Sequence, residues 1–211
     1  GTGVQTCALP ISYDDAMDVA QAEATEDIHE SASVTPSDEG FGQATFSSLY
    51  KRRVNWLVLL VFANILSGAG IAFYEEIIEN HVVLVFFLPL LVASGGNAGA
   101  QAATLVTRGL ATGDIALNSW FRLVRKEVLV AGLLGLSMAL AIVGIGYWRG
   151  GTEVALVVTY SMLAIVVMGS LMGLCLPFIL LKLGWDPATA SGPLVTSLAD
   201  IIGVLIYFAI A

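Results

Sequence analysis

Charged residues are scarce in this chain of 211 residues, where Asp, Glu, Lys and Arg together make up 12%. Soluble domains are typically about 25% charged. This shortage, together with a hydrophobic fraction of 57%, argues against an ordinary soluble globular protein. Cysteine is also scarce, and Cys7 and Cys175 form neither a disulfide framework nor a metal-binding pattern. The composition is that of an integral membrane protein.

Basic residues are absent from residues 1–40, which contain nine acids, whereas the rest of the chain carries nine bases and eight acids. The net charge of −8 therefore belongs to a short N-terminal segment, and a nucleic-acid partner is not expected. The first eleven residues, GTGVQTCALPI, resemble an in-frame translation of a sequencing adapter. We expect residues 1–11 to be non-native and the chain to be a fragment of a longer protein.

The segment 12–33 predicts a short soluble amphipathic helix, because its apolar residues recur at helical spacing. Four acids lie at positions i, i+3, i+4 and i+7 of this segment: Glu23, Glu26, Asp27 and Glu30. Like charges at these spacings destabilise a helix by a few tenths of a kcal/mol per pair, on the order of 0.2 to 0.5, unless a cation lies between them. The stripe is either a solvated acidic face or a divalent-cation site with oxygen ligands.

Five apolar runs are long enough to cross a bilayer, which takes about 20 residues. They cover residues 54–74, 82–106, 128–148, 154–183 and 186–211. Residues 34–53 are expected to connect the soluble helix to the first run and to end in a short helix. Between the second and third runs, Asp114 is expected to cap a short amphipathic helix in the interface, with Ile115, Leu117, Trp120, Phe121 and Val124 on its apolar side. Gly150 and Gly151 are expected to form a short turn between the third and fourth runs, and Pro177 is expected to kink the fourth run.

The flanking bases predict the orientation of these runs. If the N-terminus is cytoplasmic, eight bases lie on the inner side: Lys51, Arg52, Arg53, Arg108, Arg122, Arg125, Lys126 and Lys182. Arg149 then lies on the outer side. The fold class predicted is an all-α integral membrane protein of five transmembrane helices, preceded by a soluble helix and a connecting helix. We expect it to cross the inner membrane of the cell, with the N-terminus cytoplasmic and the C-terminus outside.

Asp200 lies well inside the last apolar run. A carboxylate there costs on the order of 2.5 to 3.5 kcal/mol on insertion scales, so it usually faces a partner or a water-filled path. Small or hydroxylated residues such as Thr196 and Gly203 surround it and leave backbone carbonyls available to a hydrated ion. The alternative is a structural Asp that hydrogen-bonds to a neighbouring helix.

The second run contains the glycines Gly95, Gly96 and Gly99 in mid-span. They either permit close helix packing or loosen the helix so that backbone carbonyls line a cavity. Asn97, Gln101 and Thr104 add uncharged oxygens at helical steps of four and three residues. Together with an Asp in another run, this pattern favours a polar pathway.

A single carboxylate is too little for a cage that removes water from an ion. Mg²⁺ gives up its water reluctantly and commonly binds through one or two carboxylates while it keeps several waters. One Asp200 per chain therefore suits a hydrated divalent cation best if two chains contribute one each. A homodimer is the smallest closed assembly that does this.

Three separated motifs carry a family resemblance: DDAMDVAQAEATEDIH at 14–29, GGNAGAQ at 95–101 and DPATASGPLVTSLAD at 186–200. The chain resembles the MgtE family of magnesium channels. The resemblance implies a homodimer in the lipid bilayer, with residues 12–33 as the end of a CBS domain, 34–53 as a plug helix and 54–211 as the pore domain. It further implies that Mg²⁺ is both the transported and the regulatory ion.

The resemblance also assigns individual residues. Asp200 and the carbonyl of Thr196 would contact the transported Mg²⁺, with further pore-lining positions at Gly96, Ala100, Thr104 and Gly203 beside Asn97. Glu23, Glu26, Asp27 and Asp186 would bind regulatory Mg²⁺ and close the channel when cytosolic Mg²⁺ is high, with Asp15 and Asp18 as further sensor acids. Carboxylates that repel without the cation and gather with it would form a two-state element.

Other functions remain open on the residues alone. The nearest alternative is a gradient-coupled secondary transporter or exchanger of divalent cations, although no clear inverted repeat is visible. An enzyme is not expected. Asp186 and Asp200 would lie roughly 21 Å apart on a continuous helix, too far to act as a catalytic pair. A membrane scaffold without transport is the third alternative.

Overall fold

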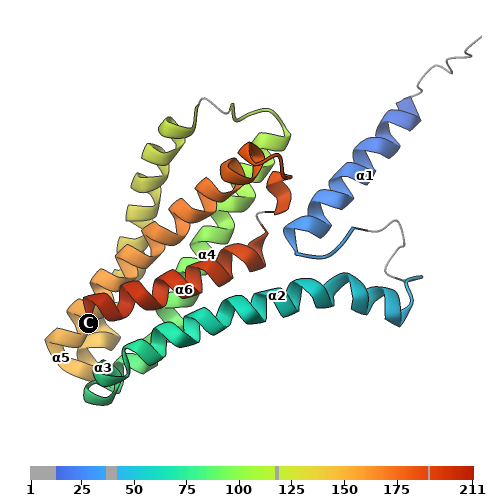
Figure 1. Cartoon of the computed structure of the whole chain (residues 1–211). Helices are drawn as coiled ribbons and strands as arrows, with labels where there is room; N and C mark the ends of the chain where they lie inside the picture. Colours follow the sequence, from blue (N-terminus) through green and yellow to red (C-terminus); the bar gives the residue numbers. More distant parts are fainter. Residues whose placement is uncertain (1–12, 37–41, 117–118, 190) are drawn as a thin grey trace, which may run out of the picture.

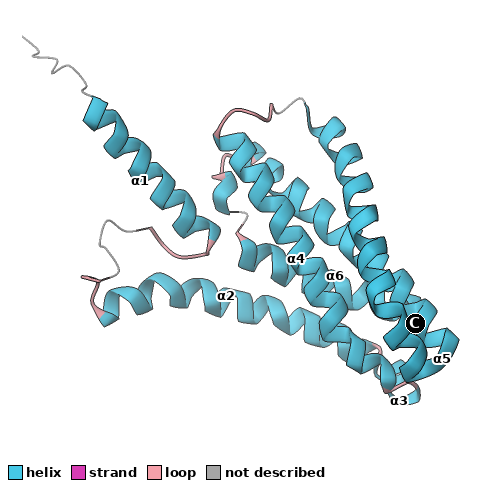
Figure 2. Cartoon of the chain, turned by 180° about the vertical axis from the view of Figure 1, so that it is seen from behind, coloured by secondary structure: helices cyan, strands magenta, loops and turns pink. Residues whose placement is uncertain are grey.

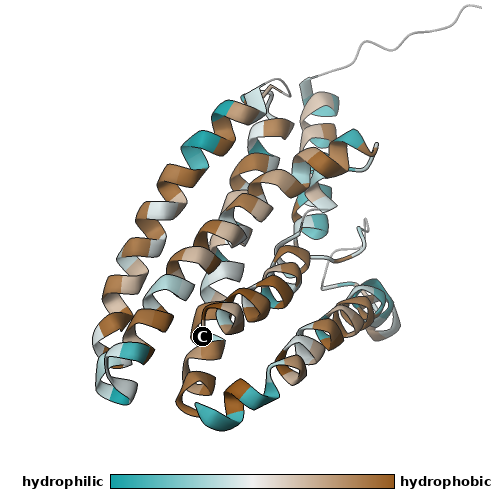
Figure 3. Ribbon diagram, turned by 60° about the vertical axis from the view of Figure 1, so that its left-hand side comes forward, coloured by the Kyte–Doolittle hydropathy of each residue, from teal (hydrophilic) through white to brown (hydrophobic). Residues whose placement is uncertain are grey.

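The computed structural model describes residues 13–36, 42–116, 119–189 and 191–211, in which all regular elements are helices (Figure 2). Their order is α1 (Tyr13–Ser31), α2 (Phe46–Phe73), α3 (Glu75–Asn80), α4 (Val83–Ala111), α5 (Trp120–Lys182), the 3-10 helix η2 (Pro187–Thr189) and α6 (Gly192–Ile210). Helices α2, α4, α5 and α6 are long and apolar enough to cross a membrane. Hydrophobic residues predominate along them in Figure 3. The predicted all-α class is confirmed.

Helix α5 is a hairpin of two helices. Over its 63 residues, the backbone leaves helical geometry at Gly151, where φ is 73° and ψ is −164°. Positive φ favours glycine, so the predicted turn at Gly150–Gly151 has its physical cause here. Gly146 lies against Ala155 and Gly135 against Leu163, which shows that the two halves run antiparallel. That each long apolar segment crosses the bilayer remains a prediction.

Successive long helices run in opposite directions, so the connections between them lie at alternate ends of the bundle. In Figures 1 and 2, α3, the bend of α5 and the C-terminus lie together at one end. The connection between α4 and α5 and the 3-10 helix η2 lie at the other end. The eight bases predicted for the cytoplasmic side therefore lie near helix ends away from the bend of α5, whereas Arg149 lies at that bend. The Arg149 guanidinium lies 4.3 Å from the ring centre of Phe86.

Several predicted boundaries are wrong. The connecting helix and the first run form one continuous helix, α2, because Thr45 caps its start and no Gly or Pro interrupts residues 46–67. The predicted loop before the second run contains the short helix α3. The last helix begins at Gly192 rather than near Asp186, since Ser191 caps it and Pro193 occupies a first-turn position where its missing N–H costs nothing.

The separate interfacial helix predicted for residues 107–127 is also wrong. Its first residues belong to α4, and Trp120, Phe121 and Val124 lie in the first turns of α5. Between the two helices, Gly113 has a φ of 74°, and the Asp114 carboxylate accepts a hydrogen bond from the Thr112 hydroxyl (3.0 Å). Leu117 lies outside the described residues. At Pro177, the backbone keeps helical φ and ψ.

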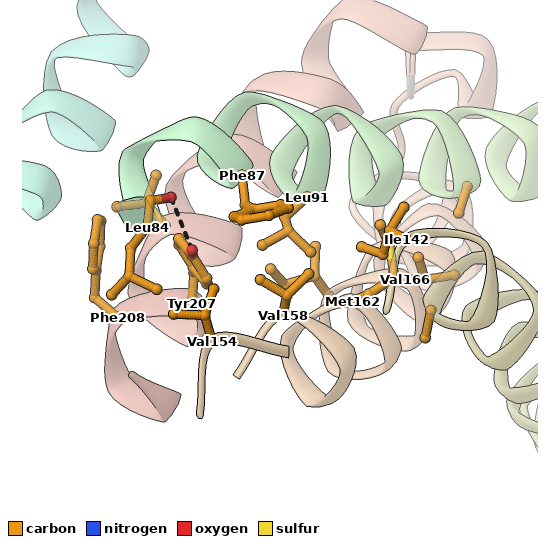
Figure 4. Close-up of a cluster of buried hydrophobic side chains, with 14 residues drawn as sticks. Leu84, Phe87, Leu91, Ile142, Val154, Val158, Met162, Val166, Tyr207 and Phe208 are labelled. Atoms are coloured by element: carbon orange, nitrogen blue, oxygen red, sulfur yellow. Dashed lines mark hydrogen bonds between the residues drawn. The ribbon is translucent and has the colours of Figure 1, made fainter. Parts of the chain in front are cut away.

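The hydrophobic core lies between α4, both halves of α5 and α6. Phe87 and Leu91 of α4 pack there against Val158 and Met162 of α5 (Figure 4). From α6, the buried hydroxyl of Tyr207 donates a hydrogen bond to the Leu84 carbonyl (2.9 Å). Helix α2 contacts this bundle mainly through α6, and α1 extends away from it in Figure 1. The bundle therefore holds α4 and α6, the helices with the predicted pore residues, side by side.

Candidate functional site

Asp200 lies on α6, partly buried, between Thr196 and Gly203 on the same face of the helix. Within the described residues, its carboxylate has no hydrogen-bond or ion-pair partner in the chain. The predicted alternative of an Asp bonded to a neighbouring helix of the same chain is therefore not supported. A carboxylate in an apolar segment without a protein partner needs water, a cation or a second chain to compensate its charge.

Helices α4 and α6 approach closely beside Asp200. A Cβ atom placed on Gly96 would lie 3.2 Å from Cγ2 of Thr196, so this glycine keeps the two helices in contact. One turn beyond Asp200, a Cβ on Gly203 would lie 3.6 Å from Val92. The Thr196 hydroxyl donates to the carbonyl of Pro193 (3.0 Å) and so remains tied to its own helix.

A polar stripe lies along the open face of α4. Asn97, Gln101 and Thr104 are exposed, whereas the neighbouring Ala98, Ala102 and Ala103 are buried. Ala100, Gln101 and Thr104 line an open groove of about 450 Å³. Thr104 satisfies its own hydroxyl with the Ala100 carbonyl (2.9 Å). Amide side chains exposed in mid-helix are unsuited to lipid, so this face is expected to meet water or another chain.

The other glycines of this helix serve packing. Gly95 and Gly99 lie against the second half of α5, where Gly169 and Gly173 have no room for a side chain because their Cβ positions would collide with the backbone of Gly95 and Gly99. Helix α4 remains helical throughout. Of the two interpretations left open for these glycines, close packing is the one found for Gly95 and Gly99.

The acidic helix α1 contacts the rest of the chain at its C-terminal end. Ser33, two residues beyond the end of α1, has a positive φ of 57°, is buried and shares a hydrogen bond of 2.6 Å with the Ser191 hydroxyl. Ser191 also caps α6, since its oxygen accepts from the Leu194 N–H (3.4 Å). The end of the acidic helix is thus bonded directly to the start of the helix that carries Asp200.

The Glu30 carboxylate of α1 contacts the loop before α6. Glu30 accepts a hydrogen bond from the Thr189 hydroxyl (3.4 Å), and Asp186 accepts one from the Ala188 N–H (2.7 Å). Burial raises the pKa of Glu30, and the negative charges of Asp186 and Glu26 raise it further. The part of this raised pKa that comes from Asp186 and Glu26 reflects repulsion between the carboxylates when they are charged.

The predicted regulatory ligands are not gathered into one site. Among the described residues, no group of three or more His, Cys, Asp or Glu side chains could hold a metal ion. Glu23 and Glu26 are exposed and Asp27 is partly buried, while Asp15 and Asp18 lie exposed in the first turns of α1. The ligand set of a regulatory cation therefore stays a prediction, with Asp186 and the C-terminal part of α1 as the acids that the fold brings near each other.

Sequence reasoning missed some residues of this site. Glu30 closes the acidic stripe at i+7 and contacts the loop, yet the family resemblance did not assign it a regulatory role. Gly169 and Gly173 carry the same four-residue spacing as Gly95 and Gly99, a pattern that would have predicted their pairing. The bond between Ser33 and Ser191 had no sequence signal, because 158 residues separate its partners.

Comparisons with known proteins agree with the family resemblance. The sequence model of the MgtE family, described as a divalent cation transporter, matches residues 88–210. The magnesium transporter MgtE of Thermus thermophilus is 41% identical over 201 residues, covering 95% of this chain and 45% of the relative. Those of Bacillus subtilis and Enterococcus faecalis are 37% and 33% identical over 95% of this chain and 44% of each relative. The chain spans less than half the length of these relatives. A transporter family agrees with the prediction that the chain is not an enzyme.

Proposed function

Since the chain belongs to the MgtE family of divalent cation transporters, we propose that it forms the membrane part of a Mg²⁺ channel, with the pore between two copies. Relatives named magnesium transporters support Mg²⁺ as the transported ion. The alternation of helix ends and the placement of the bases support an inner-membrane protein whose N-terminus is cytoplasmic and whose C-terminus is outside.

The observation that carries this proposal is the unpaired carboxylate of Asp200 in an apolar helix. Its charge has no partner among the described residues and lies beside the contact between Gly96 and Thr196. A cation that moves along this face would compensate the charge. One carboxylate is enough for a Mg²⁺ ion that keeps most of its waters, because such an ion binds proteins through one or two carboxylates.

The exposed polar stripe of α4 supports a second copy. Asn97, Gln101 and Thr104 would face water in a pore between two chains, and the backbone oxygens of α6 at Thr196 would complete the wall. Two-fold symmetry would place two copies of Asp200 around one ion. The acyl chains of a bilayer offer these amides no hydrogen bonds, which favours the paired arrangement.

Gating by cytosolic Mg²⁺ is the second part of the proposal. Mg²⁺ bound between Asp186 and the acids Glu26, Asp27 and Glu30 would relieve the repulsion that, after burial, raises the pKa of Glu30. Glu23, Asp15 and Asp18 lie farther along α1 and would extend the attraction. Because Ser33 is bonded to the N-cap of α6, a cation that docks α1 would bias the position of the pore helix.

The test is Mg²⁺ flux into vesicles that contain the full chain and an internal Mg²⁺ indicator. Asp200→Ala should lower the flux to the level of protein-free vesicles, because the pore loses its one charged ligand. Asp114→Asn is the matched control, since it removes a carboxylate that is exposed at a helix connection. Its flux should stay near that of the parent chain.

Two outcomes would contradict the proposal. If Asp200→Ala inserts normally and conducts like the parent chain, Asp200 is structural and the pore lies elsewhere. If flux requires a Na⁺ or proton gradient, the protein is a coupled transporter rather than a channel. Flux that follows the Mg²⁺ gradient alone supports the channel.

A further inference from the structure

The first turns of α5 carry an open groove of about 820 Å³ that the transport proposal does not use. Three of the residues that line it are basic: Arg122, Arg125 and Lys126. Phe121, Val128 and Leu129 form its apolar part. The groove lies at the end of the bundle where the connection between α4 and α5 is found.

The charge of this groove is unbalanced. All three bases are exposed, and no carboxylate of the described residues forms an ion pair with them. The next residue, Glu127, does not line the groove, and its carboxylate accepts a hydrogen bond from Ser170 in the other half of α5. The groove therefore presents three basic side chains to whatever occupies it.

The apolar side chains lie beside these charges in a defined order. Phe121 and Leu129 are 70% and 71% exposed, which is unfavourable in water and ordinary against acyl chains. Leu129 lies about 10 Å beyond Arg122 along the helix axis, at a rise of about 1.5 Å per residue. The basic side chains are thus at the helix end, and the apolar ones continue into the membrane-length segment.

We propose that this groove binds an anionic phospholipid of the leaflet at that end of the bundle. The phosphate lies against Arg122, Arg125 and Lys126, and an acyl chain lies along Phe121, Val128 and Leu129. A basic pocket at the end of a membrane helix is suited to anionic headgroups, and each base contributes to the attraction. A soluble anion would use the bases alone and leave the apolar side chains in water. The inference requires only that the chain lies in a bilayer, and it does not depend on Mg²⁺ transport.

Phe121→Trp provides the probe, since Phe121 lines the groove and is 70% exposed. The full chain carries this change, with Trp56, Trp120, Trp148 and Trp185 replaced by Phe, and is placed in phosphatidylcholine vesicles as the parent chain of the experiment. Brominated phosphatidylglycerol and brominated phosphatidylcholine are then compared as quenchers of its tryptophan fluorescence. Phosphatidylglycerol should quench at severalfold lower mole fraction, and the preference should weaken at high salt.

Variants distinguish binding in the groove from a general effect of surface charge on the lipid preference. Replacing Arg122, Arg125 and Lys126 by Gln should remove this severalfold preference, because each base contributes to the attraction for the anionic headgroup. The matched control replaces Lys51, Arg52 and Arg53 by Gln, which removes the same charge from α2 near the same membrane surface, and it should keep the preference. The double variant Arg122→Lys and Arg125→Lys keeps the positive charge and should also keep the preference for phosphatidylglycerol.

Equal quenching of the parent chain by the two lipids would overturn the proposal, whatever the variants do. If the α2 control loses the lipid preference to the same extent, the preference comes from general surface potential, and the proposal is overturned as well. Inorganic phosphate should not remove the preference, because it has no acyl chain. Displacement by phosphate would assign the groove to a soluble anion instead.

Discussion

The crossing of α4 with the second half of α5 and the contact of α1 with the loop before α6 are built in opposite ways. At the crossing, Gly169 and Gly173 bring backbone against backbone, and a single added carbon has no space. At the α1 contact, two hydroxyl bonds hold an otherwise exposed helix, and carboxylates repel across it. The crossing has one arrangement, whereas the α1 contact depends on few bonds and is the part of the chain that the proposed regulatory cation would move.

The largest expected effect comes from filling the crossing. In Gly173→Ala, the new Cβ would collide with the backbone of Gly99, so the unfolding free energy should fall by about 3 kcal/mol, at the upper end for overpacking. Thermal unfolding of the purified chain in detergent measures this loss. Gly132→Ala is the control, because nothing lies within 4 Å of its Cβ position. Equal stability of the two variants would show that the helices separate easily.

A smaller effect is expected from the hydroxyl pair at the α1 contact. Ser33→Ala removes one hydrogen bond worth about 1 kcal/mol, so the docked fraction of α1 should fall about fivefold relative to the undocked one. Ser191→Ala removes the same bond and should also lower the free energy of unfolding by about 1 kcal/mol, since it removes the N-cap of α6. Pulsed EPR between spin labels at Val19 and Leu183, both exposed, reports the docked distance once Cys7 and Cys175 are replaced by Ala.

The control for this pair is Ser31→Ala, because that hydroxyl bonds only the carbonyl of Ile28 in its own helix (2.9 Å). Its distance distribution should match that of the parent chain. If Ser33→Ala and Ser31→Ala behave alike, the bond between Ser33 and Ser191 does not hold α1, and the proposed connection to α6 fails.

The smallest expected effect is the pH dependence of the same distance. The pKa of Glu30 is raised above its ordinary value of 4.5, so the docked state favours the protonated carboxyl. Docking is therefore strongest below the ordinary pKa and weakens as the pH rises through the raised pKa. Glu30→Gln should keep α1 docked at neutral pH, and its docked fraction should exceed that of the parent chain by less than about fivefold. At the same pH, Mg²⁺ should restore docking of the parent chain. A docked fraction of the parent chain that rises with pH would contradict this assignment.

Local patterns predicted much of the fold. The shortage of charge and the long apolar runs indicated membrane helices, and the Gly150–Gly151 pair correctly marked the bend of α5. Predicted helix boundaries were wrong where no Gly or Pro interrupts the helix, as at residues 46–67 of α2. They were also wrong where a helix cap lies inside an apolar run, as at Ser191. A helix continues until its backbone is interrupted, so apolar runs alone do not mark where it begins or ends.

The candidate site was predicted only in part, because local patterns do not show which distant segments come into contact. Asp200 was recognisable because a carboxylate in an apolar run is costly wherever the helix lies. The partners of Gly95 and Gly99 and the bond between Ser33 and Ser191 join residues far apart in the chain, which periodicity does not relate.

The sequence by itself therefore determined the helical class, the turn at Gly151 and the presence of a carboxylate that needs a cation or water, because each follows from the local cost of charge or backbone conformation in an apolar segment. Only the tertiary structure decided which face of α4 packs and which stays open, since that depends on where Gly169 and Gly173 allow the closest approach. It also decided that the acidic helix ends on the cap of α6, because hydrogen bonds between distant segments form only once the fold brings them together.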